Sequence, residues 1–86
     1  MSFEGALIRE QGVTFAVVIV KQHVVQSHTG ANQAIRSFQP AFPDCPVVLM
    51  AQDAWGVPTY YGRRDLVNFL ANTPVEAIPW SRFSIS

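Results

Sequence analysis

The apolar run over residues 13–20 is the feature of this sequence that most constrains its fold. The run reads Val-Thr-Phe-Ala-Val-Val-Ile-Val, so β-branched residues dominate and the polar spacing of a surface helix is missing. Side chains alternate between the two faces of a strand, and here both sets are mostly apolar. The run therefore predicts a strand that is buried on both sides.

The elements on either side of this strand follow from turn residues, prolines and helical periodicity. Gln11-Gly12 predicts a tight turn to a preceding strand, because glycine tolerates positive φ. Pro58 lacks an N–H group, which predicts an edge position for its strand. The expected elements are strands over 6–10 and 13–20, a helix over 31–38 capped by Ser27 or Thr29, strands over 47–51 and 57–61, a helix over 63–71, and a strand or extended tail over 80–85.

This order predicts one α+β domain over residues 1–86, with the pattern β-β-α-β-β-α and a fifth strand or tail. We expect an antiparallel sheet with two helices on one face. Little chain then remains to cover the other face, which carries Ala16, Val18 and Val20. Either the C-terminal segment or a second subunit covers it, and we favour a homodimer through this sheet face.

Composition excludes several classes of function. Lys and Arg number 6 and Asp and Glu number 6, and charged residues make up only 14% of the chain. Zero net charge argues against nucleic-acid binding and against electrostatic attachment to a membrane. So few charges leave part of the surface weakly polar, and such surface often binds another protein. A single cysteine, with no signal peptide and no apolar run long enough for a membrane span, predicts a cytoplasmic protein.

Groups for catalysis or metal binding are few. Cys45 has no visible activating environment, so an inert thiol is a better interpretation than a nucleophile with His23 or His28 as its base. The two histidines lack the spacing of metal ligands. The chain contains no glycine-rich phosphate loop and no paired carboxylates. We therefore expect no catalytic residue, no metal site and no cofactor.

The densest polar and aromatic cluster comprises Tyr60, Tyr61, Arg63 and Arg64. On a strand the two tyrosines point to opposite faces, and the arginines then stand at the start of a helix, where backbone N–H groups point outward. Arginine suits bidentate contact with phosphate or carboxylate, so the cluster predicts a site for a small anion or an acidic partner. The alternatives are stacking on single-stranded nucleic acid and a solvated helix start.

Trp55 lies in the predicted turn over residues 53–56, where it is either a binding anchor or a ring folded back onto the sheet edge. These features together favour a small homo-oligomeric binding or protein-interaction module without catalysis. The alternatives are a small enzyme or enzyme accessory subunit that uses the cluster over residues 60–64, and a nucleic-acid-binding module.

Two resemblances to known proteins add to this interpretation. Residues 56–59 (Gly-Val-Pro-Thr), followed by 66–70 (Leu-Val-Asn-Phe-Leu), resemble the C-terminal half of thioredoxin-fold proteins, but the chain has no Cys-x-x-Cys and redox activity is not implied. Residues 46–53, Gly56, 58–63 and 77–80 resemble a pattern in short uncharacterised bacterial proteins. That resemblance implies a free-standing bacterial protein and carries no activity.

Overall fold

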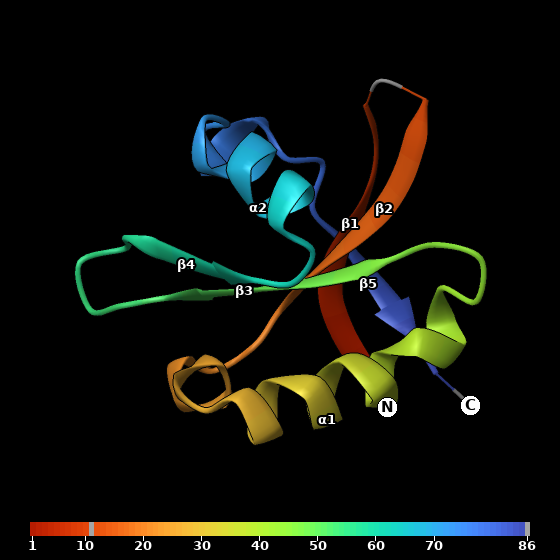
Figure 1. The fold of residues 1–86 in the computed structure, drawn as a ribbon, viewed down its shortest axis with the longest axis horizontal. Coiled ribbons are helices and arrows are strands. Elements are labelled where there is room, and N and C mark those ends of the chain that lie inside the picture. Colours follow the sequence, from red (N-terminus) through yellow and green to blue (C-terminus); the bar gives the residue numbers. More distant parts are fainter. Residues whose placement is uncertain (11, 86) are drawn as a thin grey trace.

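A five-stranded sheet runs through the middle of the molecule, with one α-helix on each side of it (Figure 1). The computed structural model describes residues 1–10 and 12–85. The predicted order of strands and helices is confirmed, and the C-terminal segment does form a fifth strand. In chain order the elements are β1 (Ser2–Glu10), β2 (Val13–Ile19), η1 (Gln22–Gln26), α1 (His28–Phe38), η2 (Gln39–Ala41), β3 (Val47–Gln52), β4 (Pro58–Tyr61), α2 (Arg64–Ala71), η3 (Val75–Ala77) and β5 (Ser81–Ser84), where η marks a short 3-10 helix.

The strands lie in the order β4-β3-β2-β1-β5. The pairs β1–β2, β1–β5 and β3–β4 are antiparallel, whereas β2 and β3 are parallel. The sheet is therefore mixed, and the prediction of a purely antiparallel sheet is wrong for the β2–β3 pair. The reason is that the long connection between β2 and β3 contains α1, and a helical crossover returns the chain in the same direction.

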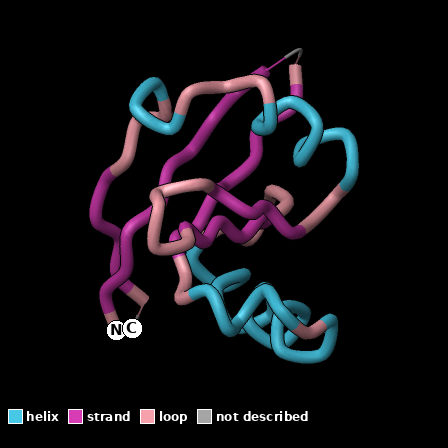
Figure 2. The backbone as a smooth tube through the Cα atoms, turned by 90° about the vertical axis from the view of Figure 1, so that its left-hand side faces the viewer, coloured by secondary structure: helices cyan, strands magenta, loops and turns pink. Residues whose placement is uncertain are grey.

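The two helices lie on opposite faces of the sheet, so the prediction of both helices on one face is wrong (Figures 1 and 2). The alternation along β2 serves both layers: Phe15 and Val17 face α2, whereas Ala16 and Val18 face α1. The buried residues of the α2 layer are Ala6, Phe15, Val17, Val48, Met50, Leu66, Leu70 and Ile78, and those of the α1 layer are Phe3, Ala16, Val18, Ala31, Phe42, Val47 and Leu49.

The sheet face that was expected to bind a second subunit is covered within the chain. Ala16 and Val18 are fully buried, and Val20 packs against the same cluster. The cover comes from Ala31 on α1 and from Phe42 in the segment that follows it. The predicted homodimer interface is therefore wrong, because this chain buries that face itself.

Local signals account for the start of α1 and for the position of β4. The hydroxyl of Ser27 accepts a hydrogen bond of 2.9 Å from the backbone N–H of Gly30, which caps the helix as predicted. Strand β4 lies at the sheet edge, in agreement with Pro58. The predicted turn includes Gln11, which lies outside the described residues.

Strand β1 begins at Ser2, earlier than predicted, because its first residues pair with β5 along the other edge of the sheet. The N- and C-terminal ends of the chain lie beside each other at this edge (Figure 2). Two hydrogen bonds join the backbones of Met1 and Ile85 there. Among the helices that the structure describes, none has the length and apolar character to cross a membrane.

Candidate functional site

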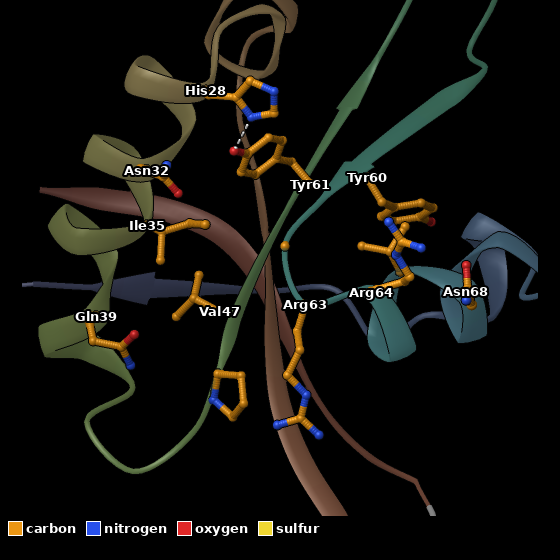
Figure 3. Close-up of a pocket in the computed structure, with 13 residues that line it drawn as sticks. His28, Asn32, Ile35, Gln39, Val47, Tyr60, Tyr61, Arg63, Arg64 and Asn68 are labelled. Carbon is orange, nitrogen blue, oxygen red and sulfur yellow. Dashed lines mark hydrogen bonds between the residues drawn. The ribbon is translucent and has the colours of Figure 1, made fainter.

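A groove of about 820 Å³ lies where strand β4 ends and helix α2 begins (Figure 3). Its walls come from α1, from the end of β4, from the start of β3 and from the first turns of α2. Two arginines and one histidine line it, and no Asp or Glu does so in the described part of the chain. The lining residues are His28, Asn32, Ile35, Gln39, Pro46, Val47, Tyr60, Tyr61, Gly62, Arg63, Arg64, Val67 and Asn68.

A hydrogen bond between His28 and Tyr61 connects the α1 wall of the groove with its β4 wall. His28 is the first residue of α1, Tyr61 is the last residue of β4, and the Nδ1 atom of His28 lies 2.7 Å from the Tyr61 hydroxyl oxygen (Figure 3). Their rings are tilted, with centroids 5.5 Å apart. The sequence did not connect His28 with the cluster, because this contact joins residues 33 positions apart that only the crossover through α1 brings together.

Tyr60 packs on the α2 layer and Tyr61 on the α1 layer, so the prediction that they point to opposite faces is confirmed. The hydroxyl oxygen of Tyr60 is buried and has no hydrogen-bond partner among the described residues. Burial also raises the pKa of this hydroxyl. An unpaired buried hydroxyl costs about 1–3 kcal/mol of stability, so an acceptor that reached it would be stabilising.

The two arginines of the cluster have different environments. The Nε and Nη2 atoms of Arg63 donate hydrogen bonds to the two carboxylate oxygens of Asp65, at 2.7 and 2.8 Å. These bonds hold the pKa of the Asp65 carboxyl below its usual value. No second ion pair occurs within residues 1–10 and 12–85, so Arg64 has no carboxylate of this part of the chain within 4.0 Å. The predicted arginine pair therefore supplies one uncommitted cation, Arg64.

Two asparagines that were not predicted as site residues add to the polar lining, one on each helix. Asn32 follows His28 by four residues on α1, and Asn68 follows Arg64 by four residues on α2 (Figure 3). This spacing puts each amide on the same side of its helix as the preceding charged or aromatic group. The spacing is visible in the sequence, but it gains meaning only when His28 and Arg64 are known to share a groove.

Trp55 does not belong to the groove. It lies in the β3–β4 hairpin turn and is 89% exposed, so the interpretation of a ring folded back onto the sheet is wrong. The five binding residues expected from the sequence are thus separated by the fold. Tyr60, Tyr61, Arg63 and Arg64 share the groove, and Trp55 stands apart from it.

Cys45 is half-buried and lies outside the groove. Burial, and secondly the negative charge of Asp44, raise the pKa of its thiol.

We expect iodoacetamide at pH 7 to alkylate Cys45 more slowly than it alkylates glutathione, because less thiolate is present. Asp44→Asn should increase the rate by removing the nearby negative charge, and mass spectrometry at timed intervals measures both rates. Alkylation faster than that of glutathione would contradict the interpretation of an inert thiol.

Comparisons with protein-family models, with curated proteins and with solved structures find no match to this chain. The resemblances to thioredoxin-fold proteins and to short bacterial proteins therefore remain predictions. Within the described residues, no group of three or more His, Cys, Asp or Glu side chains is placed to hold a metal ion.

Proposed function

We propose that this chain is a small binding module that holds an anionic ligand in the groove at the end of β4. The observation that supports this best is the lining itself: Arg64 and the His28–Tyr61 pair line one groove, and no described carboxylate lines it with them. Positive charge without an internal partner favours an anion in that position. Arg63 contributes less, because its Nε and Nη2 atoms already donate hydrogen bonds to Asp65.

The polar groups suit a planar anion. A guanidinium can donate two parallel hydrogen bonds to a carboxylate, and such charge-assisted bonds are roughly twice as strong as neutral ones. Tyr61 and His28 add a hydroxyl and an imidazole on the α1 side. Arg64 lies beside Tyr60 on the α2 side of β4, whereas the His28–Tyr61 pair lies on the α1 side, so a ligand that contacts both must cross the end of β4 (Figure 3).

The apolar part of the lining narrows the class of ligand. Ile35, Val47 and Val67 contribute aliphatic side chains from α1, β3 and α2. Ligand pockets commonly combine such a lining with a few convergent polar groups. A carboxylate that carries a short apolar body uses both parts of the groove, whereas inorganic phosphate uses only the polar part.

A chemical-shift titration of the ¹⁵N-labelled protein at low salt tests this function. Hexanoate, acetate and inorganic phosphate are the probes, and hexanoate should bind most tightly, with shifts at Tyr61, Arg64 and His28. Arg64→Ala should weaken binding by roughly 10-fold or more, since a hydrogen bond to a charged group contributes about 1.5–3 kcal/mol. Salt should weaken binding further, because the contact lies at the surface.

Arg36→Ala is the matched control, because Arg36 is an exposed arginine of α1 that does not line the groove. It should leave the affinity for hexanoate unchanged. Equal losses in the Arg36 and Arg64 variants would show a general charge effect and contradict the proposed site. A single-stranded oligothymidine forms a further arm, and shifts confined to that probe would favour the nucleic-acid alternative.

The homodimer expected from the sequence also remains a prediction. Since α1 covers the sheet face that carries Ala16 and Val18, any dimer must use another surface of the molecule.

A further inference from the structure

The β3–β4 hairpin presents Trp55 to solvent on a backbone that is held in place. Its turn is closed by backbone hydrogen bonds from Asp53 N–H to the Val57 carbonyl oxygen at 3.1 Å and from Gly56 N–H to the Asp53 carbonyl oxygen at 3.0 Å. One carboxylate oxygen of Asp53 also accepts from the N–H groups of Trp55 and Val57, at 2.8 and 2.9 Å. Gly56 supplies the φ of 81° that this turn requires. The turn therefore fixes the backbone at Trp55 in a position from which the indole projects into solvent.

A hollow of about 630 Å³ lies beside this indole. Its other wall is the segment after α2, where the indole Nε1 of Trp80 donates to the Val75 carbonyl oxygen at 3.0 Å and so presents the ring as an apolar surface. Glu76 is the one charged side chain in the lining, as far as the described residues show. We call this surface the Trp55 patch; its apolar members are Trp55, Val57, Pro58, Pro74, Val75 and Trp80.

We infer that the Trp55 patch is the contact between two copies of this chain, with Trp55 of each copy seated in the hollow of the other. A two-fold dimer uses the same patch on both subunits, so the patch must carry both a protrusion and a hollow. This patch carries the two side by side: an indole that is 89% exposed and a hollow lined by Pro74, Val75 and Trp80.

Charge also favours a second copy as the occupant. The chain has a net charge of zero, so two copies approach each other without overall repulsion. The patch is depleted in charge, as the centres of protein interfaces are, and tryptophan is among the residues that contribute most to binding there. Because the Asp53 turn already orders the backbone at Trp55, association loses little backbone entropy at this residue.

The open edge of β4 argues against an extended peptide as the occupant. The bond from Asp53 N–H to Val57 fixes which pairs of the β3–β4 ladder are hydrogen-bonded. By alternation, the backbone groups of Thr59 point toward β3, and those of Pro58 and Tyr60 point to the open side. Pro58 has no N–H to donate, so a peptide that added a strand here would lose a hydrogen bond. A contact made by side chains does not need that hydrogen bond, and a seated indole makes such a contact.

The size of the patch indicates a weak dimer. A standard interface buries about 800 Å² on each partner, which is about one seventh of the 5458 Å² of accessible surface of this chain. The Trp55 patch comprises only a hairpin tip and one short connector, which is less surface than a standard interface uses. We therefore expect dissociation constants in the micromolar range.

Sedimentation equilibrium from about 1 to 500 µM tests the inference. The wild-type chain should pass from monomer to dimer, and Trp55→Ala should weaken the dimer by at least roughly 10-fold, as central tryptophans commonly do. The fold should survive this change, because the indole makes few contacts within the chain, and an unchanged melting temperature at low protein concentration checks this. Leu7→Ala is the matched control: Leu7 is an exposed apolar residue, 47% accessible, on β1 outside the patch.

A second measurement reports on the indole directly. In protein labelled with 5-fluorotryptophan, the ¹⁹F resonance of Trp55 should move with concentration, and the Trp55→Ala variant identifies it. A wild-type chain that stays monomeric at the highest concentration would overturn the inference and leave the patch to a different protein. A dimer that persists in Trp55→Ala, or a static Trp55 resonance in the dimer, would overturn it as well. Neither result bears on the groove, which shares no residue with this patch.

Discussion

Leu70→Ala should lower the free energy of unfolding by about 2–5 kcal/mol. Leu70 is 1% exposed and lies in the α2 layer, in the cluster that includes Phe15 and Met50. Truncation removes the apolar contacts of three carbon atoms and leaves a cavity between the helix and the sheet. Because α2 has only 8 residues, its stability depends on this packing more than on helix propensity. Urea unfolding followed by circular dichroism measures the loss.

Leu7→Ala is the control for this experiment, because it makes the same chemical change at a side chain that is 47% exposed. It should cost less than about 1 kcal/mol, as surface substitutions usually do. A loss below about 1 kcal/mol for Leu70→Ala as well would mean that α2 does not pack on the sheet as described, and the α2 wall of the groove would then lose its support.

The sequence predicted which residues of each helix face the core, but it did not predict how deeply each one lies. The helical spacing marks Phe38 and Leu70 alike as core residues. In the structure Leu70 is buried in the middle of its layer, whereas Phe38 is half-buried at the end of α1, with its ring centroid 4.8 Å from that of Phe3. Depth of burial depends on the neighbouring elements, and these are set by long-range contacts.

The same limit explains why the helices were placed on one face. The alternation of Phe15 and Ala16 along β2 shows that both faces are apolar, and this prediction is correct, since both residues are fully buried. Periodicity does not tell which sheet face each helix meets. A helix on each side of the sheet covers both faces of β2 within one chain, so no second subunit is needed to bury them.

The candidate site was predictable only in its local half. The residues over 60–64 adjoin one another in the chain, so their clustering at the start of α2 could be predicted. Asp65 was visible as a first-turn acid that suits the helix dipole, but its bidentate bond to Arg63 is a matter of side-chain geometry. His28 required the parallel crossover, which the prediction of an antiparallel sheet did not contain.

Gly5→Ala should destabilise the protein by about 1–3 kcal/mol or more, through overpacking inside the sheet. A Cβ atom at Gly5 would lie 2.7 Å from the carbonyl oxygen of Val17 and 3.6 Å from the rings of Phe3 and Phe83. The first of these contacts is with backbone, which cannot rotate away as a side chain can. Gly5 lies in the part of β1 that pairs with β5, the part that the sequence analysis left out of the first strand.

Gly12→Ala is the matched control, because it adds the same methyl group where no atom beyond its chain neighbours lies within 4 Å. Its cost should be limited to backbone strain at a φ of 79°, about 1 kcal/mol. In Gly5→Ala, hydrogen exchange should also speed up at the amides of β5, since the strand that holds β5 must shift to admit the methyl group. Equal stability of the two variants, with unchanged exchange in β5, would show that β1 does not approach Val17 as closely as the structure places it.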